Sequence, residues 1–282
     1  METSSAWKRS ATIYCGIVFI ASWSLWIAAG RSGDATTEVS FLFLHLDISQ
    51  KSVLIVLGSV VPGIVGLIMK LLDDQRPLRS FLIQLGPPKS PKLLYVFAVF
   101  APLAVNLTMF MAQENLNLSA LAGLRLGDFT RLFFVNILLG PLWEEIGWRG
   151  YLLPTLSKQI GLGRAALAVG LIWGSWHFVL YHSVLQVSVY SYLISFGVIV
   201  AMAVVLAVLY SASNNMLVLP ILFHTSWNAA TNWVIGVEPR YDVRPIVLQA
   251  VGVWVLAGLA WFWYCWLQGK PSPPTSGLRP SR

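Results

Sequence analysis

The chain has little charge: only 11% of its 282 residues are Asp, Glu, Lys or Arg, whereas 56% are hydrophobic. Soluble domains contain about a quarter charged residues, so a soluble globular fold is excluded. The short alternating strands that are typical of a transmembrane β-barrel are also lacking. We therefore predict an all-α, polytopic bundle of membrane helices that forms one integral membrane domain over residues 1–282.

Cysteine is scarce as well. The two cysteines, Cys15 and Cys265, both lie inside apolar runs, so no disulfide framework is expected. The net charge of +7 comes without any block of interleaved basic and aromatic residues. Such blocks are typical of nucleic-acid surfaces, so no nucleic-acid partner is predicted.

Long apolar runs are abundant. A helix needs about 20 apolar residues to cross a bilayer. The first run is expected to be an uncleaved span, because its apolar core is longer than that of a cleaved signal peptide. The piece Phe41–Leu46 is too short to cross and is expected to be a loop or interfacial segment, and the Pro-rich residues 270–282 a flexible tail. Eight spans are predicted in all: 11–29, 52–72, 93–112, 129–150, 164–182, 187–210, 215–233 and 246–267.

Lysine and arginine fall unevenly on the two sides of these spans. Thirteen of the 19 basic residues lie on the side of the N-terminus and six on the other side. Because basic residues concentrate in cytoplasmic loops, both termini are predicted to be cytoplasmic. The membrane would be the cell membrane in a prokaryote and the endoplasmic reticulum in a eukaryote.

Two adjacent carboxylates and an arginine end the fourth predicted span, in the sequence PLWEEIGWRGY at residues 141–151. Charged side chains inside a membrane cost about 2.5–3.5 kcal/mol each on insertion scales, so they indicate function. Glu145 and Arg149 are four residues apart and can pair on one helical face. Glu144 is rotated by about 100° from that face and can meet another helix. We expect Glu144 to carry the chemistry and the other two residues to support it.

Two later histidines, His177 and His224, are predicted at a depth similar to that of Glu144. His177 lies in the fifth predicted span, and His224 and Asn228 lie one turn apart in the seventh. This set suits hydrolysis of an amide by activated water. Glu144 would take a proton from the water, a step worth about 10²–10⁴-fold in rate, and His177 would help to hold the water. His224 and Asn228 would donate to the developing oxyanion, each worth about 10²–10³-fold.

The three motifs resemble those of the CAAX-protease and bacteriocin-processing family, which includes the type II CAAX prenyl endopeptidases. They are Glu-Glu-x-x-x-Arg at 144–149, Trp173-x-x-x-His177 and His224-x-x-x-Asn228. The resemblance covers residues 129–233 and implies an eight-span intramembrane endopeptidase in which the first motif glutamate activates water. The two histidines and the asparagine would complete the site. The second motif commonly begins with Phe, and this chain keeps an aromatic ring there in Trp173.

A metal-free site is predicted, with zinc as the alternative. Glu144, His177 and His224 would be the zinc ligands. The chain lacks a His-Glu-x-x-His helix, the usual way to present two histidines to zinc. Asn228 also fits an oxyanion donor better than a metal ligand. No cofactor is therefore expected.

The expected partners are the lipid bilayer and a peptide or protein substrate at the membrane. The substrate would be a CAAX-like prenylated tail, a leader peptide or another membrane-associated peptide, cut near the cytoplasmic side. One alternative is a non-catalytic bacteriocin self-immunity or membrane scaffold protein of the same fold. Another is a transporter or proton relay, which also uses buried Glu and His. No paired interrupted helices in two related halves support the transporter.

Overall fold

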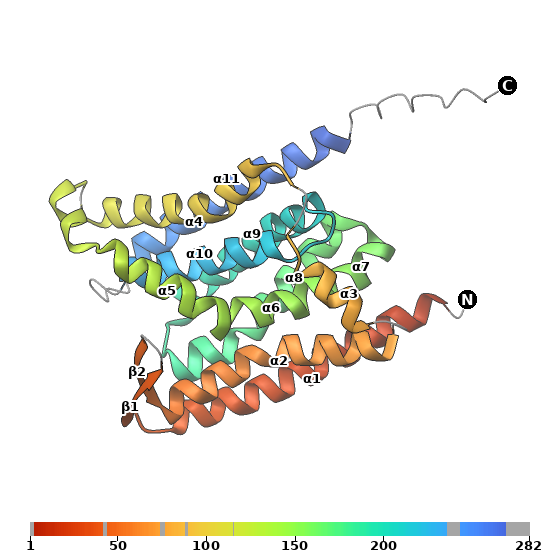
Figure 1. Cartoon of the computed structure of the whole chain (residues 1–282), viewed down its shortest axis with the longest axis horizontal. Helices are drawn as coiled ribbons and strands as arrows, with labels where there is room; N and C mark the ends of the chain where they lie inside the picture. Colours follow the sequence, from red (N-terminus) through yellow and green to blue (C-terminus); the bar gives the residue numbers. More distant parts are fainter. Residues whose placement is uncertain are drawn as a thin grey trace.

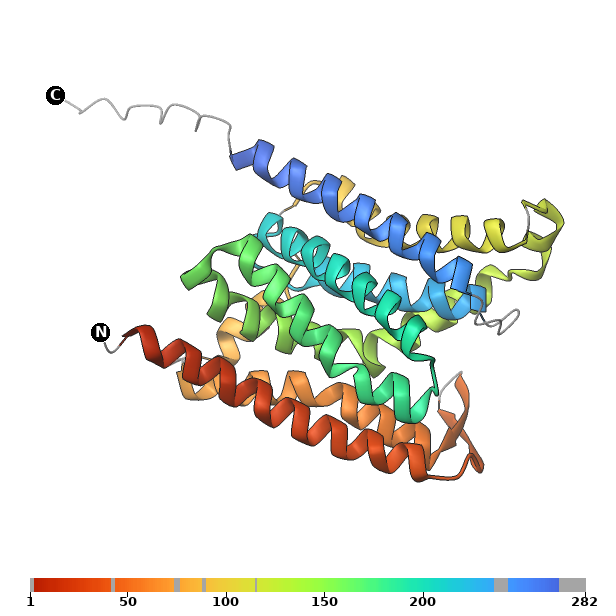
Figure 2. The same ribbon diagram turned by 180° about the vertical axis from the view of Figure 1, so that it is seen from behind.

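The computed structural model describes residues 3–41, 44–73, 77–87, 90–114, 116–235 and 243–268. Its long helices lie side by side in a bundle (Figure 1). The first helix, α1 (Thr3–Arg31), starts at the end of the bundle where the last helix, α11 (Val243–Gln268), finishes. The strands β1 (Thr36–Phe41) and β2 (Leu44–Ser49) lie at the opposite end, and the view from behind agrees (Figure 2). We call these the terminal end and the hairpin end.

The remaining elements follow in chain order. They are α2 (Gln50–Asp73), α3 (Pro77–Gln84), α4 (Lys92–Gln113), the 3₁₀ helix η1 (Leu118–Gly123), α5 (Leu126–Leu139), α6 (Pro141–Gly147), the π-helical turn η2 (Trp148–Leu152), α7 (Leu153–Ile160), α8 (Leu162–Trp176), the π-helical turn η3 (Leu180–Val184), α9 (Val189–Ala212) and α10 (Val218–Ile235).

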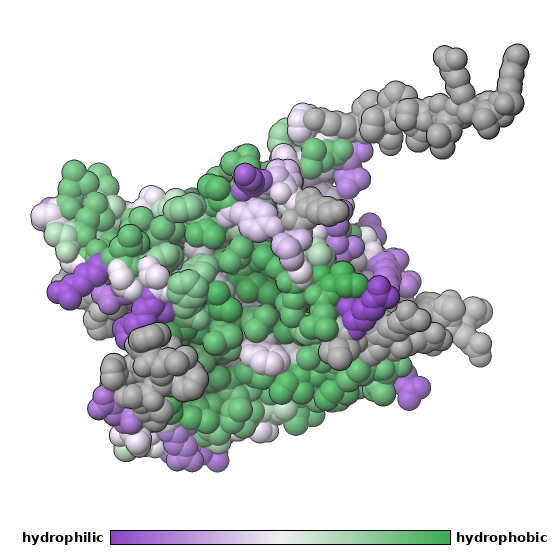
Figure 3. Space-filling model, in the orientation of Figure 1, coloured by the Kyte–Doolittle hydropathy of each residue, from purple (hydrophilic) through white to green (hydrophobic). Residues whose placement is uncertain are grey.

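The predicted all-α membrane bundle is confirmed. Helices α1, α2, α4, α9 and α11 are long and apolar enough to cross a membrane. Figure 3 shows apolar side chains over the middle of the visible face and hydrophilic ones towards the two ends, as expected for a protein whose middle contacts lipid. The count of eight spans stays a prediction, because the other three predicted spans coincide with broken or shorter helices.

The fourth predicted span, 129–150, is broken at its centre. Helix α5 ends at Leu139, and α6 begins at Pro141 after the connecting Gly140. Proline has no N–H for the helical ladder and is favoured in the first turn of a new helix, which explains the break. Because the break redirects the chain, the carboxylates that follow it lie on a short helix of their own.

The expectation of a loop at Phe41–Leu46 is corrected for its described residues, which belong to two strands, while the interfacial location stays a prediction. Phe41 ends β1 and Leu44 starts β2, and the two strands pair antiparallel from Thr36 opposite Ser49 to Phe41 opposite Leu44. These strands are rich in Thr, Val, Ile and Phe, which favour extended backbone, and this preference was overlooked in a segment judged only by its length. The predicted tail, residues 270–282, lies outside the described residues.

Helix α9 occupies the centre of the bundle and is buried along most of its length. It packs against α8, α10 and α11. On another side, α2 packs against both α1 and α6. A β-carbon on Gly147 would clash with the carbonyl oxygen of Pro62 and the hydroxyl of Tyr14, so α6 approaches its neighbours closely. This packing holds α6 against α2, and α6 also contacts α10, which carries His224 and Asn228.

Candidate active site

Glu144 lies in the first turn of α6, directly after the break in the helix. Its backbone N–H donates to the carbonyl of Gly140 at 3.0 Å, and its side chain is only 5% exposed. A β-carbon on Gly140 would lie 3.4 Å from Glu144 Oε1, an ordinary van der Waals contact, so this carboxylate oxygen lies close to the break. The Gly-Pro break therefore starts α6 and places Glu144 in its first turn.

Glu145 and Arg149 form a buried ion pair, as predicted. Arg149 Nη1 donates to Glu145 Oε1 at 2.9 Å, and the two side chains are 0–1% exposed. Arg149 belongs to η2, and π-helical turns of this kind are frequent at functional sites. Its guanidinium also lies over the ring of Trp173, 4.4 Å from the centroid. The pair thus faces protein rather than lipid or solvent.

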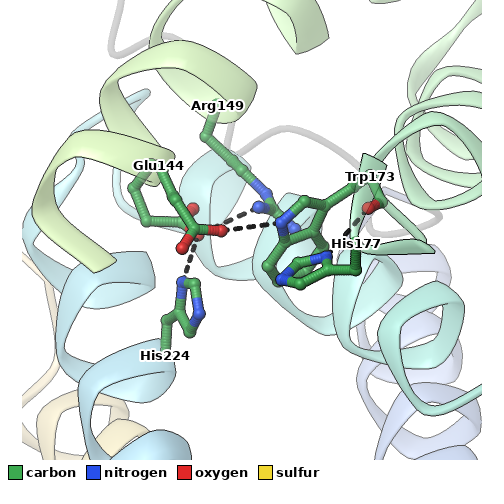
Figure 4. Close-up of polar contacts among 6 residues, drawn as sticks. Glu144, Arg149, Trp173, His177 and His224 are labelled. Atoms are coloured by element: carbon green, nitrogen blue, oxygen red, sulfur yellow. Dashed lines mark hydrogen bonds and ion pairs between the residues drawn. The ribbon is translucent and has the colours of Figure 1, made fainter. Parts of the chain in front are cut away.

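Glu145 also contacts His224, which the sequence did not predict. His224 Nδ1 lies 2.9 Å from the same oxygen, Glu145 Oε1 (Figure 4). A carboxylate can only accept, so Nδ1 carries the proton of this hydrogen bond. The bond fixes the orientation of the ring and leaves Nε2 as the nitrogen that can serve a substrate.

Trp173 is the residue whose role sequence reasoning missed. Its indole Nε1 donates to Glu144 Oε2 at 2.8 Å, and the residue is 1% exposed. Its ring centroid lies 5.1 Å from that of His224 and 5.7 Å from that of His177. A signal was present in the sequence, because a buried indole N–H needs an acceptor and Trp173 replaces a Phe that has no donor.

His177 lies at the C-terminal end of α8. Its Nδ1 donates to the carbonyl of Trp173 at 2.9 Å, so Nε2 is the nitrogen left free to accept. Its ring also packs against the rings of Trp176 and Tyr181, with centroids 4.8 and 5.9 Å away. These contacts hold the imidazole in one orientation, across the site from Glu144 (Figure 4).

One cavity of about 410 Å³ brings the four residues predicted to be catalytic together. Glu144, His177, His224 and Asn228 all line it, and so does Trp173. Glu145 and Arg149 do not line it, because they lie behind the wall that Glu144, Trp173 and His224 form. The arrangement therefore separates residues that can meet a substrate from residues that support them.

The cavity extends from Glu144 towards the hairpin end. It is lined by the early part of α2 and α9, the late part of α10, the segment after α8 and Gln249 near the start of α11. All of these lie at the hairpin end (Figures 1 and 2). If both termini are cytoplasmic, the hairpin end, towards which the cavity extends, lies on the non-cytoplasmic side of the membrane. The predicted orientation and the predicted cleavage near the cytoplasmic side therefore do not fit together.

The described side chains do not assemble a clear metal centre. Within the part of the chain that the structure describes, no group of three or more His, Cys, Asp or Glu side chains is placed to hold a metal ion. The hydrogen bonds from Trp173 to Glu144 and from His224 to Glu145 are compatible with metal binding, because ligating histidines commonly donate their other N–H to a carboxylate. Zinc is therefore disfavoured only by the lack of a group of three ligands among the described residues, and we derive no step through a metal.

Comparisons with known proteins agree with the motifs. Residues 127–230 match the family described as type II CAAX prenyl endopeptidase Rce1-like. The chain is also similar to CAAX prenyl protease 2 of Methanococcus maripaludis, with 21% identity over 242 residues. This similarity covers 78% of the chain and 83% of the relative. The family match spans most of α5 to α10 and includes Glu144, His177, His224 and Asn228.

Proposed function

We propose that this chain is an intramembrane endopeptidase of the CAAX-protease and bacteriocin-processing family and that it hydrolyses a peptide bond with water activated by Glu144; the match of residues 127–230 to the Rce1-like family supports this proposal. The observation that carries this proposal is the shared cavity of about 410 Å³, which is lined by Glu144, His177, His224 and Asn228. A scaffold protein would have no need for these four polar side chains to face one cavity, because burying polar groups in a membrane protein is costly.

Glu144 is the general base of the proposed reaction. Trp173 donates to Oε2 and fixes the carboxylate, while Oε1 lies beside Gly140. The general base takes a proton from water, and the oxygen of that water attacks the carbonyl carbon of the peptide bond. A positioned base of this kind contributes about 10²–10⁴-fold to the rate.

The other three residues hold the water and the oxyanion. His177 accepts from the water through Nε2, because its Nδ1 is bound to the Trp173 carbonyl. Asn228 donates through its amide to the developing oxyanion, where one such donor is worth about 10²–10³-fold. His224 donates from Nε2 when its ring carries both protons, and the Glu145 carboxylate beside Nδ1 then offsets the charge.

The substrate class follows from the relatives and from the membrane location. The similar archaeal protein is a CAAX prenyl protease by name. We therefore propose a peptide held at the membrane as the substrate, with a prenylated tail and a leader peptide as the two main kinds. The substrate would reach the cavity inside the bundle, so water-soluble peptides without a membrane anchor should be poor substrates.

The test uses the full-length protein in proteoliposomes. A library of membrane-anchored peptides, half of them prenylated, is incubated with the wild-type, Glu144→Gln and Glu114→Gln proteins, and the products are identified by mass spectrometry. We expect Glu144→Gln to lower turnover at least about 10²-fold. Glu114 lies at the C-terminal end of α4, outside the cavity, so its variant should retain wild-type turnover. Equal turnover by the wild-type and Glu144→Gln proteins would refute the proposal.

A further inference from the structure

The hairpin side of the cavity carries uncharged polar side chains that the proposed chemistry does not use. We call Asn136, Thr231, Asn232 and Gln249 the amide wall. They come from α5, α10 and α11 and line the same cavity as Glu144. The lining from α2, from the segment after α8 and from α9 is mainly apolar, with Ser59, Tyr181 and Ser195 as its polar side chains besides His177. The side-chain amides of the lining all come from α5, α10 and α11.

Hydrogen bonding between helices explains only part of this wall. Asn106 on α4 is fully buried behind it and accepts from Thr231 at 3.0 Å and from Gln249 at 2.9 Å. This cluster ties α4, α10 and α11 together, which is a usual role of polar residues between membrane helices. However, Gln249 uses only Nε2 in its bonds to Asn106 and Thr231, so its Oε1 is not engaged by them.

Two members of the wall contribute nothing to this cluster. Asn136 uses its Nδ2 within its own helix, at 2.8 Å from the carbonyl of Leu132, and so leaves its Oδ1 outside that bond. Asn232 is exposed and lines the cavity, and it makes no hydrogen bond to another side chain or backbone group that the structure describes. Helix packing does not account for placing these amides in the cavity.

A peptide substrate supplies the missing partners. A chain must be extended around the bond that is hydrolysed, and within the membrane its freed N–H and C=O groups then need new hydrogen bonds. Side-chain amides offer one acceptor and two donors, which match the two polar groups of a peptide unit. An uncharged wall also avoids the cost of burying an ion beside the substrate.

We propose that the amide wall binds the backbone of the substrate on the hairpin side of the scissile bond. Thr231 and Asn232 lie one helical turn beyond Asn228, a displacement of roughly 5–6 Å along α10. An extended chain rises by about 3.3 Å per residue, so the contacted peptide units lie about two residues from the cleaved bond. This inference rests on the proposed function, because it uses Asn228 to mark the position of the cleaved bond.

The test compares two variants of the wall with one outside it. Asn232→Leu and Thr231→Val remove polar groups from the wall. Thr130→Val is the matched control, because Thr130 is exposed on α5, outside the cavity, and bonds only to its own helix at Leu126. Steady-state cleavage of the membrane-anchored peptide library is measured in proteoliposomes. We expect KM to rise about 5- to 10-fold in both wall variants, as for the loss of one hydrogen bond, with kcat within about twofold of wild type.

A second readout separates substrate binding from a structural role. The peptides that the wild-type protein cleaves are resynthesised with an ester in place of each amide within three residues of the cleaved bond. The ester has no N–H. At the peptide position whose N–H binds Asn232, the ester should therefore raise KM for the wild-type protein, but it should not raise KM further for the Asn232→Leu protein. Purely additive effects, or lower melting temperatures with unchanged KM, would overturn the proposed role of the wall. The proposed function fails separately, through undiminished cleavage by Glu144→Gln.

Discussion

His224 Nδ1 lies 2.9 Å from Glu145 Oε1, the same oxygen that accepts from Arg149 Nη1. One carboxylate thus joins α6, η2 and α10. The neighbouring carboxylate, Glu144, instead meets Trp173 on α8. Adjacent glutamates therefore face different helices and have different partners. This difference predicts that Glu145→Gln mainly lowers the stability of the protein, whereas Glu144→Gln mainly lowers its activity.

We expect Glu145→Gln to destabilise the protein strongly. The substitution leaves the fully buried Arg149 without its counter-charge, and removing one partner of a buried ion pair costs about 3–5 kcal/mol. Glu144→Gln keeps an oxygen for the Trp173 indole and should retain nearly wild-type stability while losing activity. Thermal unfolding in detergent, followed by tryptophan fluorescence, measures the difference. A melting temperature for Glu145→Gln that matches that of Glu144→Gln would contradict the assignment.

Trp173→Phe should lower kcat by about tenfold or more. The ring is kept, but Glu144 Oε2 loses a hydrogen bond of 2.8 Å, and bonds to charged groups contribute about 1.5–3 kcal/mol. Trp148→Phe is the matched control. Trp148 is also fully buried, yet among the described residues its Nε1 has no hydrogen-bond partner. Because both variants lose similar ring volume, equal effects on kcat would show that the Trp173 bond does not matter.

Gly147→Ala should disturb the site from a distance. A β-carbon there would collide with the Pro62 carbonyl and the Tyr14 hydroxyl, and α6 would have to shift away from α2. Overpacking of this kind costs about 1–3 kcal/mol and would displace Glu144 in the same short helix. Gly258→Ala on α11 is the control, since nothing lies within 4 Å of its added β-carbon. We expect lower activity and a lower melting temperature in the first variant only.

The sequence was sufficient for the helical class and for Glu144, His177, His224 and Asn228, but it did not point to the polar residues of the amide wall. Span composition and the spacing of Glu145 and Arg149 depend on local rules, so they could be read directly. The bond between Glu145 and His224 joins residues 79 positions apart, and no local pattern predicts such a contact. The Trp173 bond was missed for a different reason: the residue was considered only as an aromatic ring.

Metal removal should leave the activity unchanged. The described residues offer no cluster of three ligands. The expected result is full cleavage after dialysis against a strong chelator and less than stoichiometric zinc by elemental analysis. Activity that falls with the chelator and returns with zinc would favour the alternative ligand set of Glu144, His177 and His224.

The two ends of the bundle should lie on opposite sides of the membrane, with the hairpin end outside the cytoplasm. Positive residues dominate the terminal end, and these remain in the cytoplasm. The test places single cysteines by Lys8→Cys and Thr37→Cys in a chain that also carries Cys15→Ala and Cys265→Ser. A membrane-impermeant maleimide should label the protein with Thr37→Cys in intact cells and the protein with Lys8→Cys only after permeabilisation.

The labelling result also decides from which side the substrate arrives. The cavity lining extends from Glu144 towards the hairpin end, so a hairpin outside the cytoplasm predicts that the peptide enters from the non-cytoplasmic side. The reverse labelling pattern would show that the basic residues misled the prediction of orientation. It would also bring the cavity to the cytoplasmic side, where cleavage was first expected. In either case we expect the substrate to enter from the side of the membrane opposite the two termini. The reason is that the cavity lining extends towards the hairpin end, whereas α1 starts and α11 finishes at the terminal end.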